Sequence, residues 1–272
     1  MAAVIQAALL GVVQGVTEFL PVSSTAHLLI ASRLLGFQDP GGVFTVMIQL
    51  GSIFAVVWLY RAKILDVVMG LPSRPEARRF AAMVLVALVP ALVAGGLLSG
   101  FVTRVLYNAL AVTGVTFVLG GIVILLVESR KNENVRVETA AAMTWLDALK
   151  VGIAQCFALI PGTSRSGATI IGGMLFGLSR KAATEFSFFL AVPTLVAAGL
   201  YDLWKHRSLL SAADAPIFGV GMAVSFVCAF VVIRWLIRYV ATHDFKPFAW
   251  YRIAFGLVVL VTAYLGWVDW KD

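Results

Sequence analysis

The sequence predicts an all-α polytopic membrane protein with six transmembrane helices and two re-entrant helix–break–helix hairpins, arranged as an inverted-topology repeat. Of the 272 residues, 61% are hydrophobic and 13% are charged, and the mean hydropathy is +0.95. These values exclude an ordinary soluble domain. Six apolar segments are long enough to cross about 30 Å of hydrocarbon. Two further apolar regions are interrupted near their centres by proline and hydroxyl residues.

The six predicted transmembrane helices are separated by short polar segments. No polar stretch exceeds about twenty residues, which is the scale of a loop, so residues 1–272 are expected to form a single integral membrane domain. The predicted spans lie at about 43–60, 80–100, 109–128, 184–203, 217–238 and 249–267.

The two interrupted regions lie at about 3–35 and 148–178. The first contains Pro21-Val22-Ser23-Ser24-Thr25, and the second contains Pro161-Gly162-Thr163-Ser164. A proline in a helix interior removes a hydrogen bond and breaks or kinks the helix. Each half is then too short to cross, which predicts a hairpin that dips into the membrane. A broken backbone at that depth must be satisfied by protein or by a water-filled cavity.

The basic residues of the loops predict the orientation of the chain. Five lie on one side: Arg33, Arg104, Lys205, Arg207 and Lys271. Fifteen lie on the other: Arg61, Lys63, Arg74, Arg78, Arg79, Arg130, Lys131, Arg136, Lys150, Arg180, Lys181, Arg234, Arg238, Lys246 and Arg252. The positive-inside rule places the larger group in the cytoplasm and both termini outside. It also explains the formal charge of +7 without a nucleic-acid partner.

The same orientation predicts an inverted repeat. The first hairpin begins and ends outside, the second begins and ends inside, and three spans follow each. Repeat 1 covers about 1–128 and repeat 2 about 147–270, with Pro21 and Pro161 at a constant offset of 140. Repeats of this kind form a site near the membrane midplane from their broken helices.

The interruption of the second region at Pro161-Gly162-Thr163-Ser164, called the second break, has the composition of an anion site. Proline and glycine followed by hydroxyl residues are typical of a helix start, whose free N–H groups favour phosphate. Arg165 adds a guanidinium, and Thr169 lies four residues further on the same face. A buried arginine needs an anionic partner. A salt bridge to Glu18 or Glu185 is the structural alternative to a bound phosphate.

The interruption of the first region at Pro21-Val22-Ser23-Ser24-Thr25, called the first break, lies among groups suited to acid–base chemistry. Gln14 and Glu18 are four residues apart, and Ser24 and His27 are three apart, so each pair shares a helix face. A hydroxyl, an imidazole and a carboxylate together can activate a nucleophile. The alternative is that the serine and threonine residues cap a helix and His27 only hydrogen-bonds within the bundle. Gln14 belongs to a second tier of candidates, together with two polar residues in predicted spans, Gln49 and Glu185.

The two polar stretches resemble the motifs of a known family. Residues 14–27, QGVTEFLPVSSTAH, and residues 161–169, PGTSRSGAT, are similar to the two motifs of the undecaprenyl-diphosphate phosphatases, also called bacitracin-resistance proteins. The similarity covers essentially the whole chain. It implies a bacterial inner-membrane enzyme that removes the terminal phosphate of undecaprenyl diphosphate on the outer face. That reaction recycles the lipid carrier of cell-wall synthesis and confers bacitracin resistance.

The resemblance also implies a cofactor. The family's acidic motif has Glu or Gln at its first position and Glu at its last, and this sequence has Gln14 and Glu18. A divalent cation, Mg²⁺ or Ca²⁺, is expected from the family, with Glu18 as the candidate ligand. The expected partners are a polyprenyl diphosphate lipid and the surrounding membrane lipids, and a homodimer is left open.

The mechanism predicted from these residues joins the two hairpins around a diphosphate. Ser24 is the expected nucleophile and His27 its proton-transfer partner, with His27 as direct nucleophile or a water activated by His27 and Glu18 as alternatives. The groups expected to hold phosphate oxygens, besides Arg165, are Ser23, Thr25, Gly162, Ser164, Ser166 and Thr169. The competing function is a lipid-phosphate flippase, because inverted repeats with broken helices are also a transporter architecture.

Overall fold

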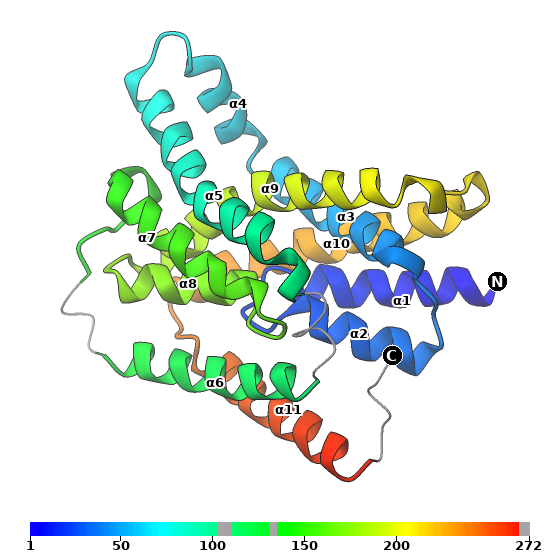
Figure 1. The fold of residues 1–272 in the computed structure, drawn as a ribbon. Helices are drawn as coiled ribbons and strands as arrows, with labels where there is room; N and C mark the ends of the chain where they lie inside the picture. The colour runs from blue at the N-terminus through cyan, green and yellow to red at the C-terminus, as the bar shows by residue number, and fades with distance from the viewer. Residues whose placement is uncertain (103–109, 131–134, 267–272) are drawn as a thin grey trace.

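The fold was analysed in a computed structural model that describes residues 1–102, 110–130 and 135–266. Six long apolar helices match the six predicted spans (Figure 1). Residues 109 and 267, at two predicted span ends, lie outside the described ranges. The six helices are α3 (Val43–Leu59), α5 (Pro75–Phe101), α6 (Leu110–Ser129), α9 (Arg180–Lys205), α10 (Ala215–Val240) and α11 (Lys246–Tyr264).

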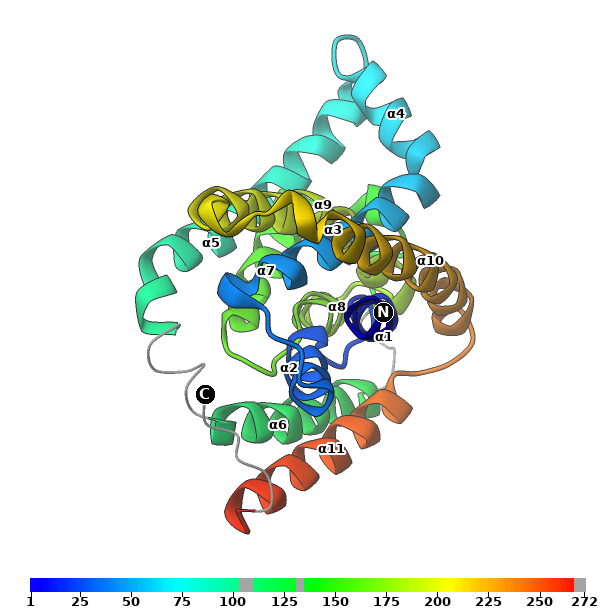
Figure 2. The same cartoon turned by 90° about the vertical axis from the view of Figure 1, so that its right-hand side faces the viewer.

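Shorter helices form the two interrupted regions. They are α1 (Ala2–Thr17) with α2 (Ser24–Leu35), and α7 (Trp145–Cys156) with α8 (Arg165–Leu175). Both breaks therefore lie where the prolines predict them. In Figure 1 the α1/α2 pair extends to the right and the α7/α8 pair to the left, with the breaks at the centre, and Figure 2 shows α1 and α2 nearly end-on.

The remaining elements are short. Helix α4 (Arg61–Gly70) occupies a segment expected to be a loop. An isolated bridge joins Val137 and Leu178. The 3₁₀ turns are η1 (Pro40–Gly42), η4 (Ala140–Ala142), η5 (Phe157–Leu159), η6 (Arg207–Leu209) and η7 (Ala212–Asp214).

Glycines allow the first helix of each pair to press against a long helix from the other half of the chain. A Cβ at Gly15 of α1 would lie 2.5 Å from the backbone oxygen of Ser225 on α10. A Cβ at Gly152 of α7 would lie 2.4 Å from the oxygen of Ala87 on α5. No larger residue fits such an approach, so both contacts require glycine.

The centre of the molecule is packed around α9. Phe186, Phe188 and Leu190 of this helix are completely buried, and Phe188 meets Phe19 edge-to-face at 5.5 Å between ring centroids. The outer helices instead expose apolar side chains, such as Leu97, which is 79% exposed. That surface suits contact with lipid.

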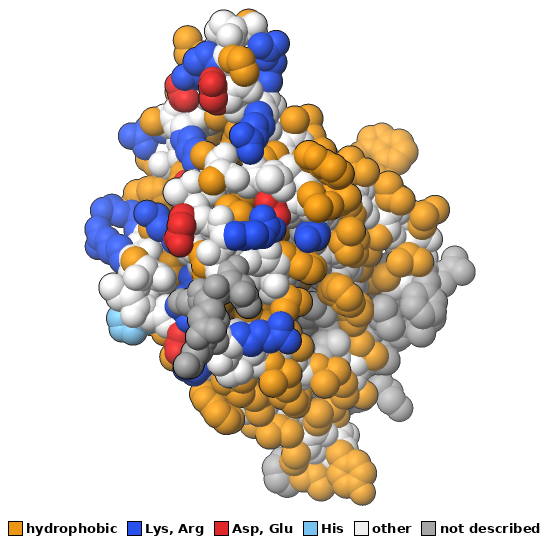
Figure 3. Space-filling view, turned by 90° about the vertical axis from the view of Figure 1, so that its left-hand side faces the viewer, with side chains coloured by type: hydrophobic (Ala, Val, Ile, Leu, Met, Phe, Trp, Pro, Cys, Tyr) orange, Lys and Arg blue, Asp and Glu red, His pale blue; other side chains and the backbone are white. Residues whose placement is uncertain are grey.

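Charged side chains gather on one face of the molecule, which Figure 3 shows from the left of Figure 1. One residue counted among the loop charges was misplaced, because Arg252 lies within α11 and is 1% exposed. It faces backbone carbonyls inside the protein, which loop spacing alone could not indicate. Arg104, Lys131 and Lys271, also used for orientation, lie outside the described residues.

Candidate active site

The two breaks share an unusual backbone conformation. Ser23 and Ser164 immediately precede α2 and α8, and they alone among the described non-glycine residues have positive φ, at 68° and 74°. A serine in this region is strained, and such strain clusters at functional sites. Only one break is capped in the usual way: Ser164 Oγ accepts a hydrogen bond from the Gly167 amide at 3.1 Å. Ser23 makes no side-chain cap.

The second break is one residue longer than the first between its proline and its strained serine, and the extra length is associated with a glycine. Pro21 and Pro161 are 140 residues apart, whereas the strained serines, 23 and 164, are 141 apart. Gly162 accommodates this extra residue with φ +85°. A Cβ there would lie 2.4 Å from Thr116 Oγ1, so both the conformation and the space require glycine.

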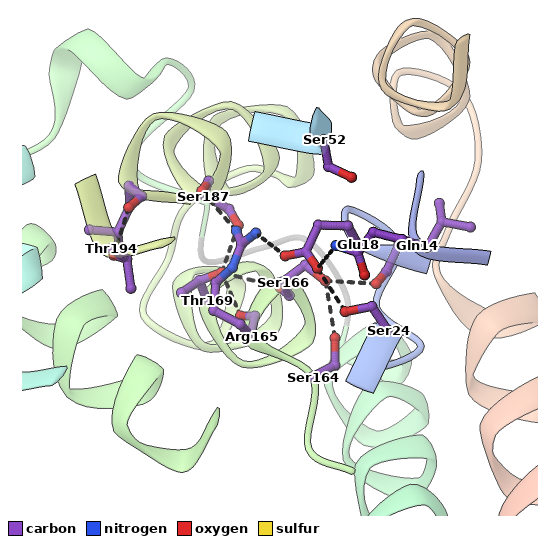
Figure 4. A network of polar contacts seen from close by, with 12 residues as sticks. Gln14, Glu18, Ser24, Ser52, Ser164, Arg165, Ser166, Thr169, Ser187 and Thr194 are labelled. Carbon is purple, nitrogen blue, oxygen red and sulfur yellow. Dashed lines mark hydrogen bonds and ion pairs between the residues drawn. The ribbon is translucent and has the colours of Figure 1, made fainter. Parts of the chain in front are cut away.

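Glu18 joins the α1/α2 pair to the α7/α8 pair (Figure 4). Its Oε1 pairs with Arg165 Nη2 at 2.9 Å, with side chains 3% and 10% exposed respectively. Its Oε2 accepts from Gln14 Nε2 at 3.0 Å and from Ser24 Oγ at 2.7 Å. Of the two acids considered as partners for Arg165, the structure therefore selects Glu18. A carboxylate, a hydroxyl and a guanidinium meet at one buried point.

The hydroxyls of the second break mostly support the fold around this cluster. Ser166 Oγ donates to the Leu20 carbonyl at 2.6 Å, and so ties α8 to the first break. Thr169 Oγ1 and Ser187 Oγ are 2.6 Å apart, and Arg165 Nη1 donates to the Ser187 carbonyl at 3.3 Å. Ser166 and Thr169, both expected near phosphate, are at most 1% exposed and have their hydroxyls engaged within the protein.

A pocket of about 700 Å³ opens beside the cluster. Two donors on its walls, Arg165 Nε and Gln155 Nε2, are buried and have no hydrogen-bond partner. Buried polar atoms in native proteins are almost always paired, so these two are available to a ligand. The predicted site residues that line the pocket are Glu18, Ser23, Ser24, Thr25, Gln49, Gly162, Ser164 and Arg165.

His27 lies to one side of the cluster. Its Nδ1 is 2.7 Å from the Ser23 carbonyl and its Nε2 is 2.5 Å from Tyr251 Oη. A carbonyl only accepts, so in the neutral imidazole Nδ1 carries the proton and Nε2 accepts from Tyr251. The expected pairing with Ser24 is not formed, because Ser24 bonds to Glu18. Side chains three positions apart still diverge by about 60° around a helix.

Glu185 is separate from this cluster. Its carboxylate pairs with Lys63 Nζ at 3.0 Å and lines a different pocket. Gln49, the other second-tier candidate, does line the main pocket. The structure therefore brings Glu18, Ser24 and Arg165 together beside a pocket that Gln49 also lines. His27 and Glu185 lie outside this cluster.

Sequence reasoning missed Arg252, which holds the two breaks together. Its Nη1 donates to the carbonyls of Pro21 and Thr163 at 3.0 and 3.1 Å. Its Nη2 donates to the carbonyls of Thr116 and Gly162 at 3.1 and 3.0 Å. The sequence did give one indication of a special role, because Arg252 is a charged residue three positions inside a predicted span.

Gln155 was also missed. The pattern Gly-x-x-Gln occurs in α1 as Gly11 to Gln14 and again in α7 as Gly152 to Gln155. Gln14 bonds to Glu18, while Gln155 keeps its free amide in the pocket wall and its carbonyl 3.4 Å from Thr194 Oγ1. The repeated spacing could have identified it.

Residues 7–258 match the family of the bacitracin resistance protein BacA. The chain belongs to this family. Curated relatives cover nearly its whole length. Proteins named undecaprenyl-diphosphatase from Acidovorax ebreus and Polaromonas naphthalenivorans are 56% and 54% identical, over 98% and 100% of this chain and 98% and 99% of their own. Undecaprenyl-diphosphatase 2 of Rhodospirillum rubrum is 56% identical over 98% of this chain and 97% of its own.

These matches confirm the resemblance seen in the two motifs. The BacA family match spans both breaks, and with them the cluster of Glu18, Ser24 and Arg165. Together with the six long apolar helices, the bacterial relatives identify the chain as a multi-pass membrane protein of bacteria.

Proposed function

We propose that this protein is an undecaprenyl-diphosphatase, which hydrolyses undecaprenyl diphosphate to undecaprenyl phosphate and inorganic phosphate. The observation that carries the proposal is the contact of Ser24 and Arg165 with the same buried carboxylate beside a large pocket. The full-length similarity to proteins of that name supports the substrate. The product is the lipid carrier of cell-wall synthesis, and its regeneration accounts for resistance to bacitracin.

In the first step, Ser24 Oγ attacks the terminal phosphorus. Its proton passes to Glu18 Oε2, which already accepts a hydrogen bond from Ser24 at 2.7 Å. The bond between phosphorus and the bridging oxygen breaks, and the lipid phosphate leaves with that proton. In the second step, a water attacks the phosphoserine and gives its proton to Glu18. The proton returns to Ser24 as inorganic phosphate departs. General base assistance of this kind contributes about 10²–10⁴-fold to rate.

Arg165 and the second break hold the phosphate. The free Nε of Arg165 and the start of α8 face a ligand in the pocket, while Nη2 keeps its bond to Glu18. Fixed donors of this kind stabilise charge that develops in the transition state. Ser23, Thr25, Gly162 and Ser164 line the same space.

His27 is proposed to position the first break. Its Nδ1–H holds the carbonyl of the strained Ser23, so that the next residue, Ser24, faces Glu18. Direct proton transfer by His27 would first require Nε2 to leave Tyr251. The pH profile of Tyr251→Phe separates these roles. A positioning His27 leaves the profile in place with activity within about threefold, and a shifted acidic limb would assign proton transfer to His27.

A divalent cation, Mg²⁺ or Ca²⁺, fits the donor set of the cluster. Both ions prefer oxygen ligands and are often held by one or two carboxylates together with substrate phosphates. Glu18 would be the protein ligand, with Ser24 and the side-chain oxygen of Gln14 nearby. When bound, the cation would neutralise charge on the diphosphate.

The finer architecture is proposed to be an inverted repeat of two re-entrant hairpins within one membrane domain. The packing of helices between the two halves of the chain supports this arrangement. Helix α1 of the first half packs against α10 of the second, and α7 of the second half packs against α5 of the first. The pocket wall includes Tyr201 and Asp202, at the end of α9 opposite its basic start. The substrate would thus enter from the outer, periplasmic face of the inner membrane.

Phosphate release from undecaprenyl diphosphate in detergent, with and without a chelator, tests the function. We expect turnover by the parent protein and a loss of about 10²–10⁴-fold in Glu18→Gln. The exposed Glu138→Gln serves as the matched control and should behave as the parent. Absence of phosphate release by the folded parent protein, with Mg²⁺ or Ca²⁺ supplied, would reject the proposal.

A further inference from the structure

A second pocket of about 380 Å³ lies where α3 ends, α9 begins and α10 ends. It shares no lining residue with the pocket beside Glu18. In Figure 1 the loop that joins α9 to α10 lies at the right, so the start of α9 and the end of α10 both lie toward the charged face on the left. None of its lining residues takes part in the proposed hydrolysis.

The pocket has a surplus of positive charge. Lys181, Arg234 and Arg238 line it, and its one lining carboxylate, Glu185, is already paired with Lys63 at 3.0 Å. Arg234 and Arg238 are four residues apart, so they project from the same face of α10. Within the described part of the chain, neither Lys181 nor Arg238 has a hydrogen bond or ion pair. Lys181 and Arg238 are therefore free to meet an anion. Arg234 lies over the Phe230 ring at 5.5 Å, and its N–H donors are also unpaired within the described residues.

A buried hydroxyl in the same pocket also lacks a partner. Thr184 lines the pocket and is 1% exposed, and its Oγ1 makes no hydrogen bond. An unpaired buried polar group is destabilising, and native proteins rarely leave one without a partner. Thr184 lies in the second turn of α9, whose N-terminal end favours negative charge. An oxygen-rich anion in the pocket would satisfy this hydroxyl and the three cations together.

The surroundings of the pocket are apolar, which indicates an amphipathic ligand. Leu59 and Ile237 belong to the lining, and Val231 and Trp235 on α10 are 59% and 46% exposed. Exposed tryptophan next to basic residues is typical of the membrane interface. A phosphate group in the pocket would have acyl chains beside it along α10.

We propose that this pocket binds the phosphate head group of an anionic phospholipid from the leaflet on the basic face. Basic pockets between transmembrane helices on the cytoplasmic side commonly hold such head groups. The ligand chemistry is a phosphate-bearing anion, and the neighbouring apolar surface selects a lipid over free phosphate. The site would bind a structural lipid and take no part in hydrolysis.

Native mass spectrometry of the purified full-length protein tests the site. Phosphatidylglycerol is titrated in a mild detergent and compared with phosphatidylcholine of the same acyl chains. We expect a saturable phosphatidylglycerol adduct that the triple variant Lys181→Ala/Arg234→Ala/Arg238→Ala weakens by at least about tenfold. Thr184→Val, which keeps the shape of the side chain, should weaken it by about two- to fivefold.

The control removes three exposed cations that do not line the pocket: Arg61→Ala/Arg78→Ala/Arg130→Ala. It should bind phosphatidylglycerol as the parent does. Both triple variants should keep phosphate release within about twofold of the parent, which separates this proposal from the catalytic one. Equal binding by the parent and the pocket variant, or equal binding of the two lipids, would overturn the proposal. Displacement of the adduct by millimolar inorganic phosphate would assign the pocket to free phosphate instead.

Discussion

The two breaks use the same backbone turn for opposite purposes. Ser23 and Ser164 have φ of 68° and 74° and both precede a helix. In the second break, Ser164 caps α8 and contacts Ser166, which bonds in turn to the Leu20 carbonyl. In the first break the cap is absent, and Ser24 bonds to Glu18. The two turns therefore differ most in the residue that follows the strained serine: Ser24 begins α2 and donates to Glu18, whereas Arg165 begins α8 and pairs with the same carboxylate.

The largest expected effect follows directly from this contrast. Ser24→Ala removes the proposed nucleophile and should lower phosphate release by about 10⁴-fold or more. Ser164→Ala removes a helix cap, and should cost about 1 kcal/mol of stability with less than tenfold loss of activity. Phosphate release and thermal unfolding of both variants provide the comparison. Similar losses in the two variants would show that the breaks are not specialised.

Trapping of a phospho-enzyme sharpens the same test. Mass spectrometry should locate the phosphoryl group on Ser24 in the parent protein. A modified His27 would remove Ser24 from the role of nucleophile.

Substitution of Arg165, the guanidinium of the second break, should cause the next largest loss of phosphate release. Arg165→Lys keeps the charge but cannot bond to Glu18, to the Ser187 carbonyl and to phosphate at once. Phosphate release should fall by about 10²–10³-fold. Arg207→Lys, an exposed arginine, is the control. Near-normal turnover in Arg165→Lys would contradict a phosphate clamp built on the second break.

Arg252 determines whether the two breaks can act together. Arg252→Met removes donors to four backbone carbonyls and a cation over the Phe117 ring at 4.9 Å. We expect a loss of at least about 3 kcal/mol and a fall in Tm of about 6–12 °C. Thermal unfolding in detergent measures it, with exposed Arg207→Met as control. An unchanged Tm would mean that the breaks are held by other contacts.

The smallest expected effect concerns the starts of helices α1 and α7. Helix α7 starts with a capping box of Thr144 and Asp147, whereas α1 has no side-chain cap. Burial alone would raise the pKa of Asp147, but hydrogen bonds from Arg136 and Thr144 lower it from 3.8 to about 2. Ionised Asp147 therefore contributes stability that is complete above about pH 5 and declines as the pH falls through 4 toward 2.

Asp147→Asn should be less stable than the parent near pH 7, with a difference that shrinks below about pH 4. Denaturant unfolding across pH 2–7 measures it. Asp66→Asn provides the control, because the Asp66 side chain also pairs with an arginine, Arg74, but is 62% exposed. A difference that does not change with pH would exclude a role for the carboxylate charge.

The sequence was sufficient to predict the spans and the breaks, because both depend on local chemistry. Apolar length locates the long helices, and proline followed by hydroxyl residues locates Ser23 and Ser164 to within a residue or two. The approach of Glu18 to Arg165 was also foreseeable as an alternative, because a buried arginine requires an anion.

The remaining features depend on which way side chains face in the folded bundle. His27 shares a helix with Ser24 but turns toward Tyr251. Arg252 follows loop residues in the sequence, yet it meets four carbonyls contributed by three other segments of the chain. Such contacts join residues that are far apart in the sequence, so no spacing rule within a single helix predicts them.

The bonds of Arg252 constrain how the molecule can move. One side chain of α11 bonds to both break loops, so neither loop can shift alone without losing buried hydrogen bonds. A rocking motion of one half against the other would have to break this junction, whereas hydrolysis at a fixed centre leaves it intact. The junction thus favours a rigid reaction centre over one that alternates between the two faces of the membrane.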